Sequence, residues 1–147
     1  MRVYLDNCCY NRPYDDQDYL SIQLETQSKL YIQKKIRDGD YELVTSEILL
    51  FEIDNMPFPM RKNSIMSFVE AHSSIHIGPN MKSSAIEHAH VIMKSGIRYK
   101  DACHIASAIL AQCQYFITTD KRVLRFVSED IKTINPIDFV RETEMIQ

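Results

Sequence analysis

Short apolar segments alternate with longer helix-forming segments along the chain, and this alternation constrains the fold more than any other feature. Residues 16–38 and 101–113 contain neither glycine nor proline and repeat apolar residues at helical spacing, so both are expected to be helices. Strands that are separated by helices return to one sheet in parallel. The sequence therefore predicts an α/β fold with a central, mostly parallel five-stranded sheet flanked by helices. The expected strands are residues 2–6, 41–44, 74–77, 115–120 and 132–134.

The composition is that of one ordinary domain spanning residues 1–147. Of the 147 residues, 45% are hydrophobic and 25% are charged, a mixture typical of globular proteins. No apolar run approaches the ~20 residues that a membrane-spanning helix requires. The first strand segment contains Asp6 and does not resemble a signal peptide. We therefore expect a cytoplasmic protein that does not associate with a membrane.

Four cysteines and five histidines raise the alternatives of disulfide bonds and a zinc site. Cys8 and Cys9 are neighbours, and Cys103 and Cys113 fall inside an expected helix. Because no secretion signal accompanies them, we expect reduced thiols. No two cysteines have C-x-x-C spacing, so a zinc site is the less favoured alternative.

The net charge of −3 argues against a broadly basic surface of the kind that nucleic-acid-binding domains usually carry. Lysines and arginines do form local clusters, such as the one at residues 121–125. Each cluster taken alone is expected to be part of a solvated face.

Acidic residues stand at or near the ends of the expected strands. Asp6 follows the first strand and Asp120 ends the fourth. Asp101 begins a helix, and Glu52 lies on the helix after the second strand. Ligands of open α/β sheets bind beyond the carboxyl ends of the strands, so we expect these side chains to converge. Taken singly, each acid also fits a turn, a helix N-cap or an exposed position.

Converging carboxylates require compensation. Two unit charges ~4 Å apart repel by about 4 kcal/mol at an effective dielectric constant of ~20. Several carboxylates therefore share a cleft only when cations bind or when some pKa values rise. A pocket of carboxylate oxygens selects hard ions such as Mg²⁺ or Mn²⁺, and such ions support phosphodiester hydrolysis without a protein nucleophile.

Four segments, YLDN, FEI, KDACHIASAI and FITTDKRVL, together resemble the PIN-domain family of VapC-like toxin ribonucleases. The resemblance spans residues 3–120 and implies a PIN-like domain. Glu52 fits the family spacing better than Glu47, which stands in the first helical turn, where an acid is expected for the helix dipole alone; the choice between them stays open. The catalytic and metal-binding residues that the resemblance implies are Asp6, Glu52, Asp101 and Asp120, with Thr118 and Thr119 leading into the last acid.

The same resemblance implies an activity and partners. The activity is endonucleolytic hydrolysis of RNA with Mg²⁺ or Mn²⁺. The resemblance also implies the toxin of a toxin–antitoxin pair, in which an antitoxin places a basic residue in the acid pocket. Homodimers are common in the family.

Three further residues are candidates for supporting roles. Asn7 is placed to orient a metal-bound water or the first acid. Arg12 either contacts a phosphate or, as the favoured alternative, pairs with Asp15 or Asp16. His104 lies one helical turn after the third acid and donates either to a carboxylate or to RNA, or is simply a packed, hydrogen-bonded side chain.

Three other protein classes compete with the nuclease interpretation. A catalytically silent binding module for protein or RNA on the same fold would lack one acid of the pocket. A receiver-like signalling domain needs a phosphorylatable Asp after the third strand, where this chain has Gly78 and Pro79. A dinucleotide-binding domain needs a G-x-G-x-x-G motif, which is absent from the sequence.

Overall fold

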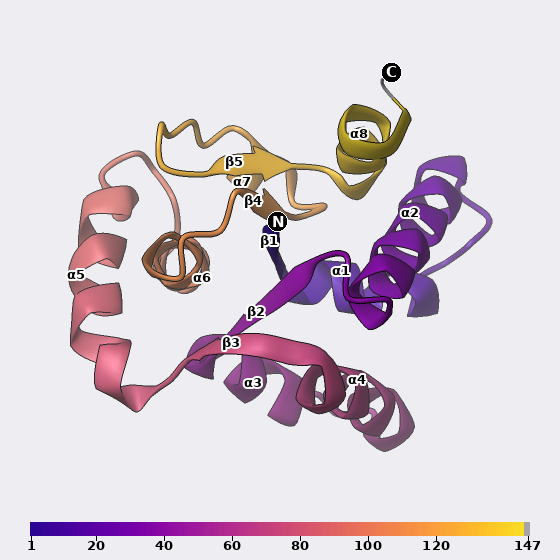
Figure 1. Ribbon diagram of the computed structural model, residues 1–147, viewed down its shortest axis with the longest axis horizontal. Coiled ribbons are helices and arrows are strands. Elements are labelled where there is room, and N and C mark those ends of the chain that lie inside the picture. Colours follow the sequence, from indigo (N-terminus) through magenta and orange to yellow (C-terminus); the bar gives the residue numbers. More distant parts are fainter. Residues whose placement is uncertain (146–147) are drawn as a thin grey trace.

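The computed structural model describes residues 1–145 and contains one five-stranded sheet with helices packed around it (Figure 1). The strands lie in the order β3-β2-β1-β4-β5. Every neighbouring pair is parallel. The predicted α/β class is therefore confirmed, and the sheet is parallel throughout. The domain predicted for residues 1–147 extends two residues beyond the described part.

All five predicted strands are present with small shifts in their bounds. The strands are β1 (Arg2–Leu5), β2 (Glu42–Ser46), β3 (Ser73–Ile77), β4 (Tyr115–Ile117) and β5 (Lys132–Ile134). The helices are α1 (Asn7–Asn11), η1 (Arg12–Tyr14), α2 (Leu20–Arg37), α3 (Glu47–Asp54), α4 (Pro59–His72), η2 (Pro79–Met81), α5 (Lys82–Met93), α6 (Tyr99–Leu110), α7 (Lys121–Leu124), α8 (Pro136–Val140) and η3 (Arg141–Met145). None of the helices within residues 1–145 combines the length and the apolar character that crossing a membrane requires.

Helices cover both sides of the sheet. In Figure 1, α5 and α6 lie side by side at one side of the sheet, and α2 and α8 lie together at the other. The central strand β1 is consequently buried, with Val3, Tyr4 and Leu5 fully inaccessible to solvent. Burial on both faces is what a continuous apolar strand in a parallel sheet requires.

The segment between β1 and α2 differs from its prediction. Residues 7–14 form α1 and η1, where no helix was expected from the sequence. The Asp6 carboxylate caps α1, and Pro13 occupies the first turn of η1. Helix α2 begins at Leu20 rather than at residue 16. The carboxylate of Asp16 accepts a hydrogen bond from the Asp18 amide (3.0 Å), a local turn that delays the helix.

The strand order places a topological switch point beside β1. From β1 the chain continues to β2 on one side, and it later returns to β4 on the other side. The tips of β1 and β4 are joined where the Asp6 amide donates to the Ile117 carbonyl (2.9 Å). Crevices at such points are the usual ligand sites of open α/β sheets, and Asp6 and the residues after β4 lie at this one.

Candidate acidic site at the carboxyl ends of the strands

The Asp6 carboxylate is held by groups from both strands of the switch point. It is 6% exposed. One oxygen accepts a hydrogen bond from the Asn7 amide (2.8 Å), and the other accepts one from the Thr118 hydroxyl (2.8 Å). Charge-assisted hydrogen bonds of this kind fix a carboxylate strongly. The tips of β1 and β4 therefore hold Asp6 in one orientation.

Asp120 lies close to Asp6 through the same threonine. The Asp120 amide donates to the Thr118 hydroxyl oxygen (3.1 Å). The Asp120 carboxylate caps α7 by accepting a hydrogen bond from the Arg122 amide (2.9 Å). Asp6 and Asp120 are therefore both helix N-caps, which was the alternative role that the sequence allowed for each of them.

Cys8 belongs to this part of the site, although its sequence suggested only a small buried hydrophobe. Its sulfur lies 3.4 Å from the Thr118 hydroxyl and 3.6 Å from the Asp6 carboxylate. The Thr119 amide donates to the same sulfur (3.3 Å). Cys9 points into the core. All four cysteines are free, as the expectation of reduced thiols requires.

Glu52 is held in a different way, by a buried chain of polar side chains. His104 Nε2 lies 3.0 Å from Glu52 Oε1. His104 Nδ1 lies 2.6 Å from the Tyr4 hydroxyl, which lies 2.6 Å from the Ser46 hydroxyl. Ser46 in turn caps α3 by accepting a hydrogen bond from the Leu49 amide (3.2 Å). Tyr4 and His104 are almost completely buried, so this chain runs through the core and ends at an acid of the site.

Asp101 reports on the electrostatics of all four acids. It lies half-buried in the first turn of α6. Burial raises its pKa, the negative charges of Asp6, Asp120 and Glu52 raise it further, and His104 opposes the shift. Asp6, Glu52 and Asp120 therefore each lie close enough to Asp101 to disfavour its charged form.

The same carboxylates favour the charged form of His104, whereas they disfavour the charged form of Asp101. Burial by itself lowers the pKa of His104, but the hydrogen bond to Glu52 and the charges of Asp6, Glu52 and Asp101 outweigh it and leave the pKa raised. The side chain is thus both packed and bonded to a carboxylate, which were alternatives in the sequence.

Two observations bear on a metal ion. None of the ion pairs among the described residues involves Asp6, Asp101 or Asp120, and the partner of Glu52 is His104. Within residues 1–145, no lysine or arginine therefore lies within ion-pair distance of the four acids. However, no three His, Cys, Asp or Glu side chains within residues 1–145 gather closely enough to hold an ion as they stand. The donor chemistry fits a hard cation, but binding requires the carboxylates to move together or to share water ligands.

The remaining predicted residues have structural partners. Arg12 pairs with Asp15 (2.9 Å), as favoured from the sequence, and with Glu25 (3.0 Å). Asn7 acts on Asp6 through its backbone amide, while its side-chain oxygen accepts a hydrogen bond from Asn11 (3.1 Å).

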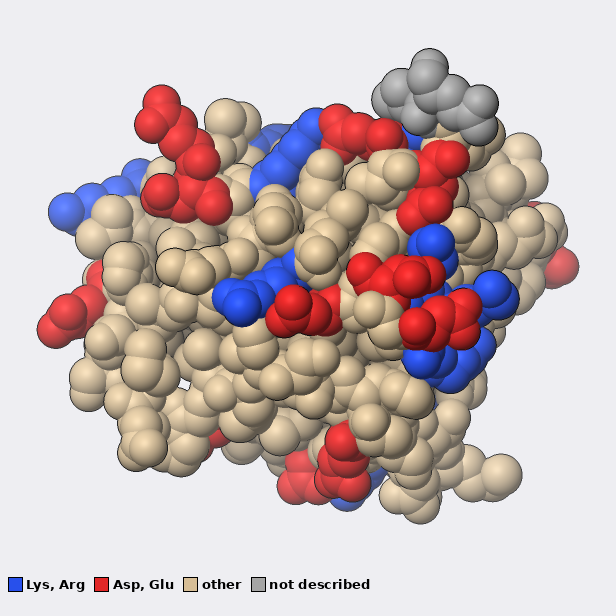
Figure 2. Space-filling view, in the orientation of Figure 1, with Lys and Arg blue, Asp and Glu red and all other residues tan. Residues whose placement is uncertain are grey.

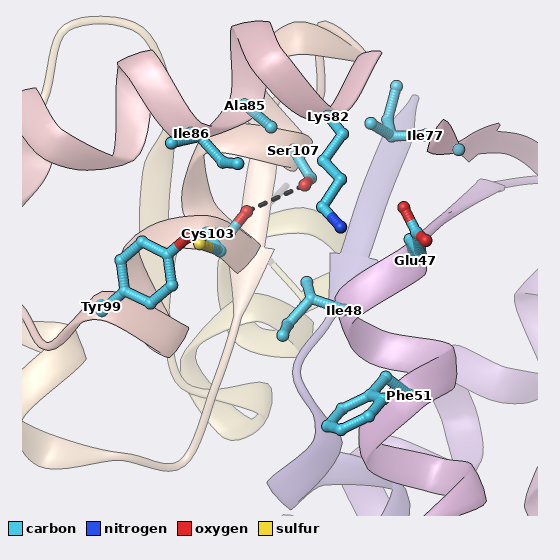
Figure 3. A pocket seen from close by; sticks show the side chains of 11 residues that line it. Glu47, Ile48, Phe51, Ile77, Lys82, Ala85, Ile86, Tyr99, Cys103 and Ser107 are labelled. Carbon is cyan, nitrogen blue, oxygen red and sulfur yellow. Dashed lines mark hydrogen bonds between the residues drawn. The ribbon is translucent and has the colours of Figure 1, made fainter. Parts of the chain in front are cut away.

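Glu47 lines an apolar pocket between α3, α5 and α6 (Figure 3). The pocket has a volume of about 190 Å³. In Figure 3, Phe51 and Tyr99 line it and the Lys82 side chain extends into it. Tyr99 and Asp101 are two residues apart on α6 and so project from different faces of that helix.

On the face shown in Figure 2, lysines and arginines are interspersed with aspartates and glutamates. No continuous basic strip crosses this face. A surface that binds a nucleic-acid backbone is usually lined by lysines and arginines. The face in Figure 2 has no such continuous lining.

Comparisons with known proteins show the fold. No family model matches the chain, and no curated protein matches it. A chain in the crystal structure of VapBC2 from Rickettsia felis, bound to a DNA fragment from the promoter, matches with a TM-score of 0.56 and 14% identity over 92% of this chain and 98% of that one. A chain in the crystal structure of FitAcB from Neisseria gonorrhoeae matches with a TM-score of 0.55 and 15% identity over 91% of this chain and 97% of that one.

These findings correct one expectation from the sequence. The resemblance to the PIN-domain family of VapC-like toxin ribonucleases is not upheld as an identification, because no family model matches and the structural neighbours, VapBC2 and FitAcB, are complexes that do not single out that family. The physical reason lies in the motifs. Asp6 and Asp120 are helix N-caps at strand ends, and other α/β chains use an acid in the same way. What the neighbours support is the predicted α/β architecture, which is consistent with a PIN-like fold.

Proposed function

We propose that this protein hydrolyses RNA phosphodiester bonds with a divalent cation bound between Asp6, Glu52, Asp101 and Asp120. The observation that carries the proposal is geometric: Thr118 joins Asp6 and Asp120 at the tips of β1 and β4, and no ion pair among the described residues neutralises either acid. The pKa of Asp101, which burial and the charges of Asp6, Asp120 and Glu52 raise, agrees with this arrangement. Carboxylates that repel one another without a basic partner are stabilised by a cation. Mg²⁺ and Mn²⁺ are the ions that such oxygen ligands select.

The residues divide the work according to their surroundings. Asp6 and Asp120 are held by Thr118 and by backbone amides, so they supply fixed ligands. Asp101 and Glu52 project from α6 and α3 and close the set as their side chains adjust. When bound, the cation supplies Lewis-acid stabilisation of the phosphoryl group and an activated water.

The structural neighbours support a biological setting. Both VapBC2 and FitAcB are toxin–antitoxin complexes. We infer that this chain works in such a system as the component that cleaves RNA, with an antitoxin as its protein partner. A basic side chain from that partner would neutralise the acids in the same way as a cation.

Cleavage of a labelled single-stranded RNA tests the proposal. Wild type is expected to cleave in millimolar Mn²⁺ and to stop in excess chelator. The Asp101→Asn variant is expected to lose about 100-fold or more in rate, since ligand loss removes several kcal/mol of transition-state stabilisation. Asp138→Asn is the matched control, because Asp138 is an exposed acid on α8 whose one ion pair within residues 1–145 is with Arg141. Cleavage by wild type that persists in chelator, or equal cleavage by the two variants, would contradict the proposal.

One observation favours a second candidate function, a catalytically silent module that binds RNA or protein. No three potential ligands within residues 1–145 lie close enough to hold an ion without movement. Under this alternative, wild type binds single-stranded RNA equally well with Mn²⁺ and with chelator, and no cleavage product appears. A product that depends on both Mn²⁺ and Asp101 would exclude it.

A further inference from the structure

We infer that His104 is a positioning residue that sets the Glu52 carboxylate for cation binding, and that Tyr4 and Ser46 fix His104 from behind. The inference rests on the proposed function and extends it to residues outside the acidic set. The first observation is that the Glu52 carboxylate has few hydrogen-bond partners. Within residues 1–145, the only hydrogen bond to its carboxylate comes from His104, at 3.0 Å. The second carboxylate oxygen has no hydrogen-bond partner there.

The polar chain behind His104 is continuous. The Leu49 amide donates to Ser46 Oγ, Ser46 Oγ lies 2.6 Å from Tyr4 Oη, and Tyr4 Oη lies 2.6 Å from His104 Nδ1. A neutral ring that accepts from Tyr4 at Nδ1 carries its proton on Nε2, and a protonated ring carries a proton on both nitrogens. In both states Nε2 donates to Glu52 Oε1, so the chain orients the donor that holds Glu52.

Packing fixes the ring as firmly as the hydrogen bonds do. His104 is 1% exposed, and its ring meets the Tyr4 ring edge-on at 5.7 Å between centroids. The Tyr4 ring stacks on Phe116 of β4 at 5.2 Å. The histidine, which belongs to α6, is therefore held against the sheet. A clamped donor orients a flexible glutamate that stands on another element, helix α3.

The chain also begins and ends on the same helix. Ser46 is the N-cap of α3, and Glu52 lies within α3. The hydrogen bonds therefore tie α3 at two points to β1 and α6. Through this tie the position of Glu52 depends on groups outside the set of four acids, and partners of this kind typically change metal affinity or activity by 10- to 100-fold when removed.

Mn²⁺ binding to the full chain, measured by isothermal titration calorimetry, tests the inference without relying on activity. His104→Leu removes the donor and is expected to weaken Mn²⁺ binding about tenfold or more. His104→Gln keeps an N–H donor close to the place of Nε2 and is expected to bind within about threefold of wild type. In a Glu52→Gln background, His104→Leu should add no further loss, because the partner it positions is gone.

A pair of tyrosine variants provides a matched control. Tyr4→Phe removes a hydroxyl that belongs to the chain. Tyr10→Phe removes a hydroxyl that is equally buried and has no hydrogen-bond partner among the described residues. Mn²⁺ binding should weaken several-fold in Tyr4→Phe and stay unchanged in Tyr10→Phe. This pair keeps the test decisive if His104→Leu fails to fold.

The outcomes separate the inference from the proposed function. Wild-type affinity in both His104→Leu and Tyr4→Phe overturns the inference and leaves the proposed function standing. Equal losses in Tyr4→Phe and Tyr10→Phe also overturn it, since general destabilisation then explains the effect. A wild-type protein that binds no Mn²⁺ at millimolar concentration overturns the proposed function and the inference together.

Discussion

The two sides of the acidic site are built by different means. On one side, Asp6 is anchored by an adjacent amide and by Thr118, which stand at the tips of neighbouring parallel strands. On the other side, Glu52 stands on a helix and depends on His104, at the end of a chain that crosses the core. The first arrangement follows from backbone positions. The second depends on how distant side chains meet.

The difference teaches which part of the site is fixed and which part adapts. Carboxylates at strand tips cannot move without breaking caps that also start helices. A glutamate with one partner can adjust while that partner holds it. We therefore expect an incoming cation to find Asp6 in place and to draw Glu52 and Asp101 toward it.

Asp101 stands under the influence of both sides, and its loss gives the largest expected effect. Beyond its loss of cleavage, Asp101→Asn should melt at a higher temperature than wild type in chelator at pH 7. Asp101 is only half-buried, so after solvent screening the gain is up to about 1 kcal/mol, or about 2–4 °C. The measurement is thermal unfolding followed by circular dichroism.

The pH dependence of that gain has a definite sign. The pKa of Asp101 in the folded protein is raised above its ordinary value of 3.8, so the ionised form destabilises the fold. This penalty is fully present above the folded pKa and disappears as the pH falls below 3.8. The melting-temperature difference between Asp101→Asn and wild type should shrink on acidification. A difference that grows as the pH falls would contradict the assigned repulsion.

The next largest effect is expected when one acid on each side of the site is neutralised. Asp6→Asn is expected to destabilise the fold by about 1–3 kcal/mol, because an amide nitrogen cannot accept the hydrogen bonds that the buried carboxylate accepts. Glu52→Gln should cost less, because the amide oxygen still accepts from His104. Urea unfolding in chelator compares them. Equal losses would mean that the two sides are anchored alike.

Two adjacent threonines give a smaller, matched test of the Asp6 side. Thr118→Val removes the hydroxyl that donates to Asp6 and accepts from the Asp120 amide, and we expect a loss of about 1 kcal/mol. Thr119→Val serves as control, since Thr119 acts here through its backbone amide. Urea midpoints should fall for the first variant and hold for the second. A larger fall for Thr119→Val than for Thr118→Val would contradict the role of the Thr118 hydroxyl in holding Asp6.

The smallest effect is expected at Arg12, outside both sides. Its ion pairs with Asp15 and Glu25 predict that Arg12→Gln loses about 0.5–1 kcal/mol of stability. RNA affinity and its salt dependence should stay unchanged, because Asp15 and Glu25 already neutralise and orient the Arg12 guanidinium, and a cation that binds no phosphate does not add to the salt dependence. Fluorescence anisotropy at several salt concentrations checks this. A shallower salt dependence in the variant would indicate that Arg12 contacts an RNA phosphate.

The sequence predicted the Asp6 side better than the Glu52 side for physical reasons. Strand ends are local signals, and parallel strands bring their ends to one edge, so Asp6 and Asp120 were found by position alone. The contact between His104 and Glu52 joins residues 52 positions apart and depends on the rotation of two helices. Tyr4 lies in an apolar strand, and nothing in that pattern shows that its hydroxyl bridges two polar side chains.

Two other features lay beyond sequence reasoning. The approach of the Cys8 sulfur to Thr118 depends on α1, a short helix that was not expected from the sequence. The spread of the acids, too wide among the described residues to hold an ion unaided, depends on side-chain rotamers rather than on motif spacing.

A crystal structure of the protein soaked in Mn²⁺, with anomalous difference maps, tests the central claim most directly. The account predicts a peak at the switch point, with oxygens of Asp6 and Asp120 within about 2.4 Å of it and Glu52 or Asp101 drawn toward it. A map without a peak at these carboxylates, at a concentration that saturates any binding in solution, would contradict the account.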